Sequence, residues 1–92
     1  MNNNNSVDGP ALGDRYSAAI DNLLSNKNPF GLTSLHLDGS ITSTEVVNEI
    51  YRHFYNDKSC LLQIVAKLRA NSDHDFGFIA DRLESLAEQQ NA

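Results

Sequence analysis

The longest apolar periodicity in this chain runs from Thr42 to Leu68, and it constrains the fold more than any other feature. Apolar residues recur every seven positions, with isoleucines at offset positions between them: Val47, Ile50, Phe54, Leu61, Ile64 and Leu68. Such a seam is typical of a helix that packs lengthwise on other helices. Further apolar side chains widen the stripe toward half of the circumference, whereas contact with one neighbour needs an arc of about 100°. The pattern therefore predicts one long helix, about 42–70, that contacts more than one neighbour.

The start of this helix has two local signals. Thr42 and Glu45 have the spacing of a capping box, in which each side chain accepts a hydrogen bond from the other residue's backbone amide. Ile41 and Val46 stand one residue before and four residues after the cap, as in a hydrophobic staple. Together they predict that the helix begins at residue 42.

The seam has one polar interruption, the segment Asn56-Asp57-Lys58-Ser59. A charge buried without a partner is costly, so three alternatives are open. The helix is unbroken and these groups reach solvent, it breaks near Asn56 and is capped again, or the charges pair across an interface. We favour the continuous helix, because only Gly, Pro or a strong cap reliably ends one.

A second amphipathic helix, about 73–89, follows the short connector 70–73. Ser72 or Asp73 can cap it, and its apolar residues recur at spacings of three and four: Phe76, Ile79, Leu83 and Leu86. The connector is too short for anything but an antiparallel return, which predicts a helical hairpin. In architecture alone, this return resembles the hairpins that dimerise into four-helix bundles in small bacterial, plasmid and phage regulators, and no family is identified from it.

The residues upstream of the hairpin predict a shorter helix, about 14–26. Asp14 can cap it, and one face carries Tyr16, Ala19, Ile20, Leu23 and Leu24. The segment from Asn26 to Pro29 ends it. In the following segment, 30–41, Leu35 and Leu37 alternate with polar residues before an Asp38-Gly39 turn. We expect this segment to be extended coil, with a short strand as the alternative.

Length and composition indicate a single all-α domain over residues 13–90. A core of this size is marginal alone, which favours dimerisation into a helical bundle. Residues 1–12 begin with four asparagines after Met1 and have little to bury, so we expect a disordered tail. No stretch approaches the ~20 apolar residues of a membrane span, and the expected location is the cytoplasm.

The polar residues predict no chemistry. The net charge is -5, with 12 acidic and 7 basic residues, and the basic residues are dispersed, which disfavours nucleic acid as a partner. The histidines, His36, His53 and His74, have no ligand spacing, and Cys60 is the single cysteine. We therefore expect no catalytic residues, no metal and no cofactor, and interpret the protein as a non-enzyme.

The excess apolar stripe predicts a small non-enzymatic regulator, inhibitor or adaptor that binds a protein, either another copy of itself or a different partner. Aromatic anchors beside aliphatic residues are typical of interfaces. The predicted interface residues are Tyr51, Phe54, Tyr55, Leu61, Leu62 and Val65. The alternatives are a DNA-binding transcriptional regulator, and an exported effector or its secretion chaperone that uses residues 1–12 for delivery.

Overall fold

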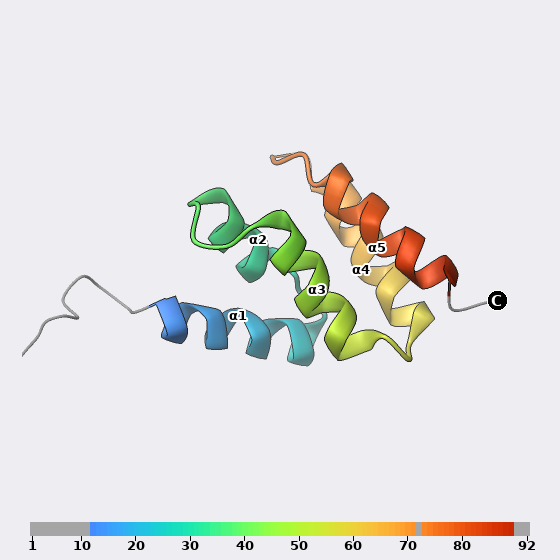
Figure 1. The fold of residues 1–92 in the computed structure, drawn as a ribbon, viewed down its shortest axis with the longest axis horizontal. Helices are drawn as coiled ribbons and strands as arrows, with labels where there is room; N and C mark the ends of the chain where they lie inside the picture. The colour runs from blue at the N-terminus through green and yellow to red at the C-terminus, as the bar shows by residue number, and fades with distance from the viewer. Residues whose placement is uncertain (1–11, 72, 90–92) are drawn as a thin grey trace, which may run out of the picture.

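The computed structural model describes residues 12–71 and 73–89. Within these residues the chain is all-helical, as predicted, and contains no strand. The helices are α1 (Leu12–Asn26), α2 (Phe30–Leu37), α3 (Ser43–Phe54), α4 (Lys58–Ala70) and α5 (Gly77–Gln89) (Figure 1). The predicted tail lies outside the described residues up to position 11, whereas Leu12 already belongs to α1.

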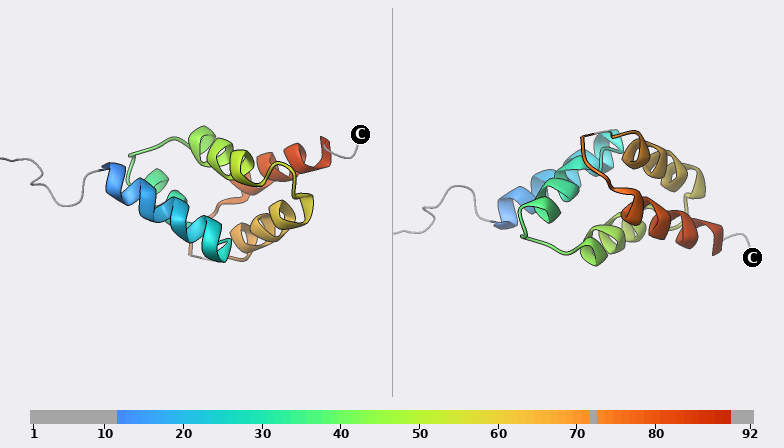
Figure 2. Two further views of the ribbon diagram at one scale, coloured as in Figure 1. Left: turned by 90° about the horizontal axis from the view of Figure 1, so that it is seen from below. Right: turned by 90° about the horizontal axis from the view of Figure 1, so that it is seen from above.

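The helices are arranged as two pairs joined by a central helix. α1 packs on α2 and α4 packs on α5, while α3 contacts α2, α4 and α5. The two pairs lie at opposite ends of the molecule, with α5 returning alongside α4 (Figures 1 and 2). α3 is therefore the element that connects the two halves of the core.

All five helices contribute to one apolar core. Fully buried side chains include Leu23 of α1, Leu32 of α2, Ile50 of α3, Leu61 of α4 and Leu83 of α5. Each such side chain contributes about 1.5–3 kcal/mol of transfer free energy relative to an exposed position. No described helix is long and apolar enough to cross a membrane.

The prediction of one continuous helix over 42–70 is wrong, because the chain breaks between Phe54 and Lys58. The side chain of Asp57 accepts a hydrogen bond from the amide of Cys60 at 2.9 Å and so caps α4. The amide of Asp57 donates to the carbonyl of Phe54 at 2.9 Å, which closes the turn. The alternative of a break near Asn56 followed by a new cap is the one the structure contains.

The prediction of an extended segment over 30–41 is also wrong, since α2 occupies Phe30–Leu37. The carbonyl of Pro29 accepts from the amides of Leu32 and Thr33, and this starts the helix. Leu32 and Leu35 are three residues apart and both are buried, which is helical spacing. The turn at Asp38-Gly39 is present as predicted, with Gly39 at φ 84°.

The predicted capping box at the start of α3 is confirmed. The hydroxyl of Thr42 accepts from the Glu45 amide at 3.1 Å, and the Glu45 carboxylate accepts from the Thr42 amide at 2.9 Å. Ile41 and Val46, the predicted staple, are both buried. Local side-chain chemistry thus determines this helix boundary.

Other helix boundaries differ from the prediction by a few residues. α1 begins at Leu12, so Asp14 lies in its first turn and is not the cap. α5 begins at Gly77 and not at 73, because the Asp75 carboxylate accepts from the Gly77 amide at 3.0 Å and forms a turn ahead of the helix. Of the two predicted caps, Ser72 lies outside the described residues. α1 ends at Asn26 as predicted.

Candidate protein-binding surface

The structure divides the six predicted interface residues into three groups. Leu61 and Val65 lie in the core of the chain itself, with exposed fractions of 0% and 3%. Tyr51, Phe54 and Leu62 are partly buried against that core. Tyr55 is 53% exposed. The part of the predicted set that a partner could contact directly is therefore centred on Tyr55.

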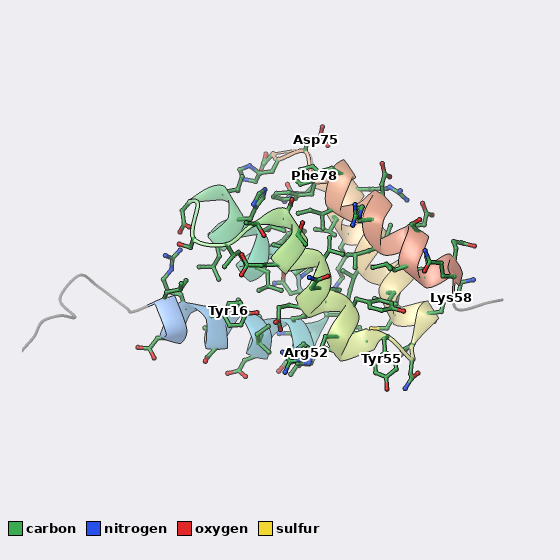
Figure 3. All side chains as sticks on the ribbon, in the orientation of Figure 1. Tyr16, Arg52, Tyr55, Lys58, Asp75 and Phe78 are labelled. Atoms are coloured by element: carbon green, nitrogen blue, oxygen red, sulfur yellow. The ribbon has the colours of Figure 1, made fainter. Side chains whose placement is uncertain are left out.

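Tyr55 stands at the corner where α3 ends. It is the C-terminal cap residue, with helical backbone angles of φ -62° and ψ -25°. Its ring packs on that of Tyr51, one helical turn earlier, with centroids 6.5 Å apart and planes inclined by 56°. Because the chain turns away after Tyr55, its side chain projects outward from the fold (Figure 3). A tyrosine held by a neighbouring ring presents apolar area at a low entropic cost.

Leu62 lines a different feature, an open groove of about 620 Å³ on the α4 surface. Val65, Ala66 and Ala70 line it as well, and Arg69 and Glu84 are its charged residues. The guanidinium of Arg69 donates to Asp81 at 2.6 Å and to Glu84 at 2.9 Å. This contact lowers the pKa of Glu84. The groove thus has an apolar lining, and its two charged residues are already paired.

A polar cluster joins α1 to α3. The carboxylate of Glu49 lies 3.3 Å from the Arg52 guanidinium and 3.6 Å from the His53 ring. Burial, followed by a hydrogen bond to Glu49, raises the pKa of Tyr16 to about 12. Tyr16 therefore remains a protonated hydrogen-bond donor near neutral pH. The cluster holds two helices together through mutually satisfied groups.

Cationic side chains are largely occupied within the chain. Five of the seven lysines and arginines bind carboxylates or backbone carbonyls: Arg15 to Asp38, Arg52 to Glu49, Lys58 to Glu88, Arg69 to Asp81 and Glu84, and Lys67 to Asn26 and Lys27. For Lys27 and Arg82, the structure records no ion pair with the residues it describes.

The remaining candidates for chemistry are dispersed. Over residues 12–71 and 73–89, no three His, Cys, Asp or Glu side chains are placed to hold a metal ion. Cys60 is buried, and burial, with a further contribution from Asp57, raises the pKa of its thiol. The thiolate that a nucleophile requires is therefore disfavoured.

Sequence reasoning missed Phe78, which is 47% exposed on α5. Its ring meets that of His36 edge to face at 5.7 Å, and it lines a groove of about 350 Å³ with Val47 and Arg82. A signal was available, because Phe78 falls outside the Phe76, Ile79, Leu83 spacing that defines the buried side of the helix. An aromatic residue off the buried stripe is expected to reach solvent.

Comparison with known proteins gives no relative for this fold. No protein-family model matches the chain, and no curated protein or solved structure is significantly similar to it. Function is therefore inferred from the surfaces described above.

Proposed function

We propose that this chain is a small, cytoplasmic, non-enzymatic regulator, inhibitor or adaptor that acts by binding protein, either a different partner or a second copy of itself. The observation that carries the proposal is Tyr55, which is 53% exposed at the end of α3 and packs on the ring of Tyr51. Tyrosine is enriched among the residues that dominate the binding energy of protein interfaces. Phe78 of α5, also half-exposed, offers a second aromatic contact, in the groove between α5 and the first half of α3.

Two observations support binding over catalysis. Tyr16 and Cys60 both have raised pKa values, so neither supplies an anion near neutral pH. The groove beside Tyr16 does gather ionisable side chains, but its Glu49 carboxylate is already paired with Arg52 and His53. A DNA-binding role is less well supported, because five of seven cationic side chains are already engaged. The export alternative depends on residues 1–12, of which only Leu12 is described.

The test is a comparison of partners captured by the wild-type chain and by Tyr55→Asp in the cells that make it, with bound proteins quantified by mass spectrometry. We expect a discrete set of partners to be lost with Tyr55→Asp and kept with Tyr55→Phe. Leu24→Asp is the matched control, because Leu24 is 46% exposed on a different helix, α1. Circular dichroism must show that all variants keep their helicity.

Two results would contradict the proposal. The captured proteins could be the same for Tyr55→Asp and the wild type, which would remove Tyr55 from the binding surface. Alternatively, Leu24→Asp could lose the same partners, which would make the effect one of charge and not of this surface.

A further inference from the structure

The turn between α3 and α4 joins two helices whose sequence has the pattern of one helix. Val47 and Phe54 are seven residues apart, as are Phe54 and Leu61, so the seam continues in phase across the break. The turn contains neither Gly nor Pro. Tyr55 already has helical backbone angles, and Asp57 is a residue that departs from them, at φ -127° and ψ 80°. Conversion of the turn into helix therefore needs a change of backbone angles at Asp57 and none at Tyr55.

The turn leaves backbone groups at both helix ends without helical partners. The first amides of α4 and the last carbonyls of α3 lack the bond that each would make four residues along a continuous helix. The described replacements are the Asp57 carboxylate on the Cys60 amide and the Phe54 carbonyl on the Asp57 amide. One side-chain cap is therefore a principal restraint that keeps the turn closed.

The packing of the helices defines what would move if the turn opened. α4 and α5 have their most extensive contact with each other, and α1 packs mainly on α2. The α4–α5 pair can therefore leave as a unit and keep its mutual contacts. It gives up its contacts with α3, the ring contacts of Phe76 and Phe78 with α2, and the hydrogen bonds from Lys67 to the end of α1. The surface of α3 that this movement uncovers is complementary in shape and chemistry to the α4–α5 pair of any other copy.

We infer that residues 55–57 form a hinge, and that two copies of this chain exchange their α4–α5 pairs across it. In the exchanged dimer, α3 and α4 merge into one helix over 43–70, and the α4–α5 pair of each chain packs on α3 of the other. The contacts within the core are those of the monomer, formed between chains. The inference concerns the α3–α4 junction and does not require Tyr55 to bind another protein.

The first experiment measures absolute mass by light scattering after gel filtration of the full chain, over a wide concentration range. Asn56→Ala/Asp57→Ala removes the cap and raises helix propensity in the hinge, so its dimer dissociation constant should be lower than that of the wild type by about tenfold or more. Thr42→Ala is the matched control, because it removes a similar cap from the start of α3, which the turn at Gly39 separates from α2. If Asn56→Ala/Asp57→Ala and the single variant Asn56→Ala both remain monomeric, the inference is overturned.

The second experiment separates an exchanged dimer from two monomers lying side by side. Spin labels at Asn48→Cys and Ala66→Cys, in a Cys60→Ala background with the hinge substitutions, report the distance across the hinge within one chain when labelled protein is diluted with unlabelled protein. Both sites are exposed. A continuous helix places them about 27 Å apart along its axis. A dimer whose spin-label distance equals that of the monomer would contradict the exchange.

Discussion

The ammonium group of Lys67 donates a hydrogen bond to the carbonyl oxygen of Asn26 at 3.0 Å, and a second to that of Lys27 at 3.2 Å. Lys67 is on α4 and Asn26 is the last residue of α1, 41 positions earlier in the chain. The end of a helix carries carbonyls without partners and a partial negative charge. A cation from the far half of the molecule therefore satisfies the end of the first helix.

Lys67→Met keeps much of the apolar stem and removes this contact. We expect it to lower the free energy of unfolding by about 1 kcal/mol, since the hydrogen bonds are charge-assisted but exposed to solvent. Urea denaturation followed by circular dichroism measures the loss. Arg82→Met is the control, because Arg82 is exposed and has no recorded ion pair with the described residues. Equal losses in both variants would show that the Lys67 contact contributes nothing specific.

Gly31 marks the closest approach of α2 to α1. A Cβ atom at this position would lie 2.9 Å from both the Cα and the Cβ atoms of Ala19. Gly31→Ala should therefore destabilise the fold by about 1–3 kcal/mol through overpacking. Gly13→Ala is the contrasting variant, because a Cβ atom at Gly13 of α1 would have no atom of the described residues within 4 Å, and it should stabilise the fold by about 0.5 kcal/mol. Thermal unfolding of the two variants must shift in opposite directions.

The lowered pKa of Asp38 predicts that the fold loses stability at acid pH. The Arg15 guanidinium, with help from Ser40, lowers the pKa of the Asp38 carboxyl from 3.8 to about 2. Between these values the unfolded chain takes up a proton that the folded chain does not, so this stabilisation is complete above pH 3.8 and is lost as the pH falls through about 2. Urea denaturation of wild type and Asp38→Asn across this range should show the steeper decline in the wild type. Parallel curves would mean that the ion pair does not hold in solution.

The raised pKa of Tyr16 predicts a loss of stability at alkaline pH. Burial and the Glu49 carboxylate raise the pKa of its phenol from 10.0 to about 12, so the folded state retains a proton that the unfolded state releases. This stabilisation is fully present below pH 10 and is lost as the pH rises through about 12. Tyr16→Phe should flatten the alkaline decline, and ultraviolet titration should lose its last tyrosinate transition. The inference on Tyr16 fails if that transition persists in the variant.

Features that depend on the chemistry of a few neighbouring residues were predictable from sequence. Features that depend on competition between a local signal and tertiary packing were not. The Thr42 and Glu45 box involves two side chains and two nearby amides, so its spacing determines it. At Asp57 a local cap competes with an apolar seam that favours continuation, and the periodicity carries no information on which one prevails. α2 is only eight residues long, and its leucines fit both helical spacing and alternation. Its close approach to Ala19 on α1, which Gly31 permits, is a tertiary contact that the periodicity does not report.

The candidate surface was predictable in part for a related reason. Periodicity identifies side chains that need covering, but it does not distinguish a neighbouring helix of the same chain from a partner. Leu61 and Val65 are covered within the monomer, whereas Tyr55 lies beyond the end of α3 and remains exposed. Phe78 was not predicted, because it lies outside the periodic apolar stripe of α5 from which the buried residues were inferred.

The position of Cys60 allows the opening of the hinge to be measured in the unmodified protein. Cys60 is 2% exposed and lies in the first turn of α4, and its backbone amide donates a hydrogen bond to the carboxylate of Asp57, the residue that closes the hinge. A water-soluble thiol reagent can reach it only while the beginning of α4 is detached from the core. The rate at which such a reagent modifies the wild-type protein therefore measures how often this region opens, and no engineered label is needed.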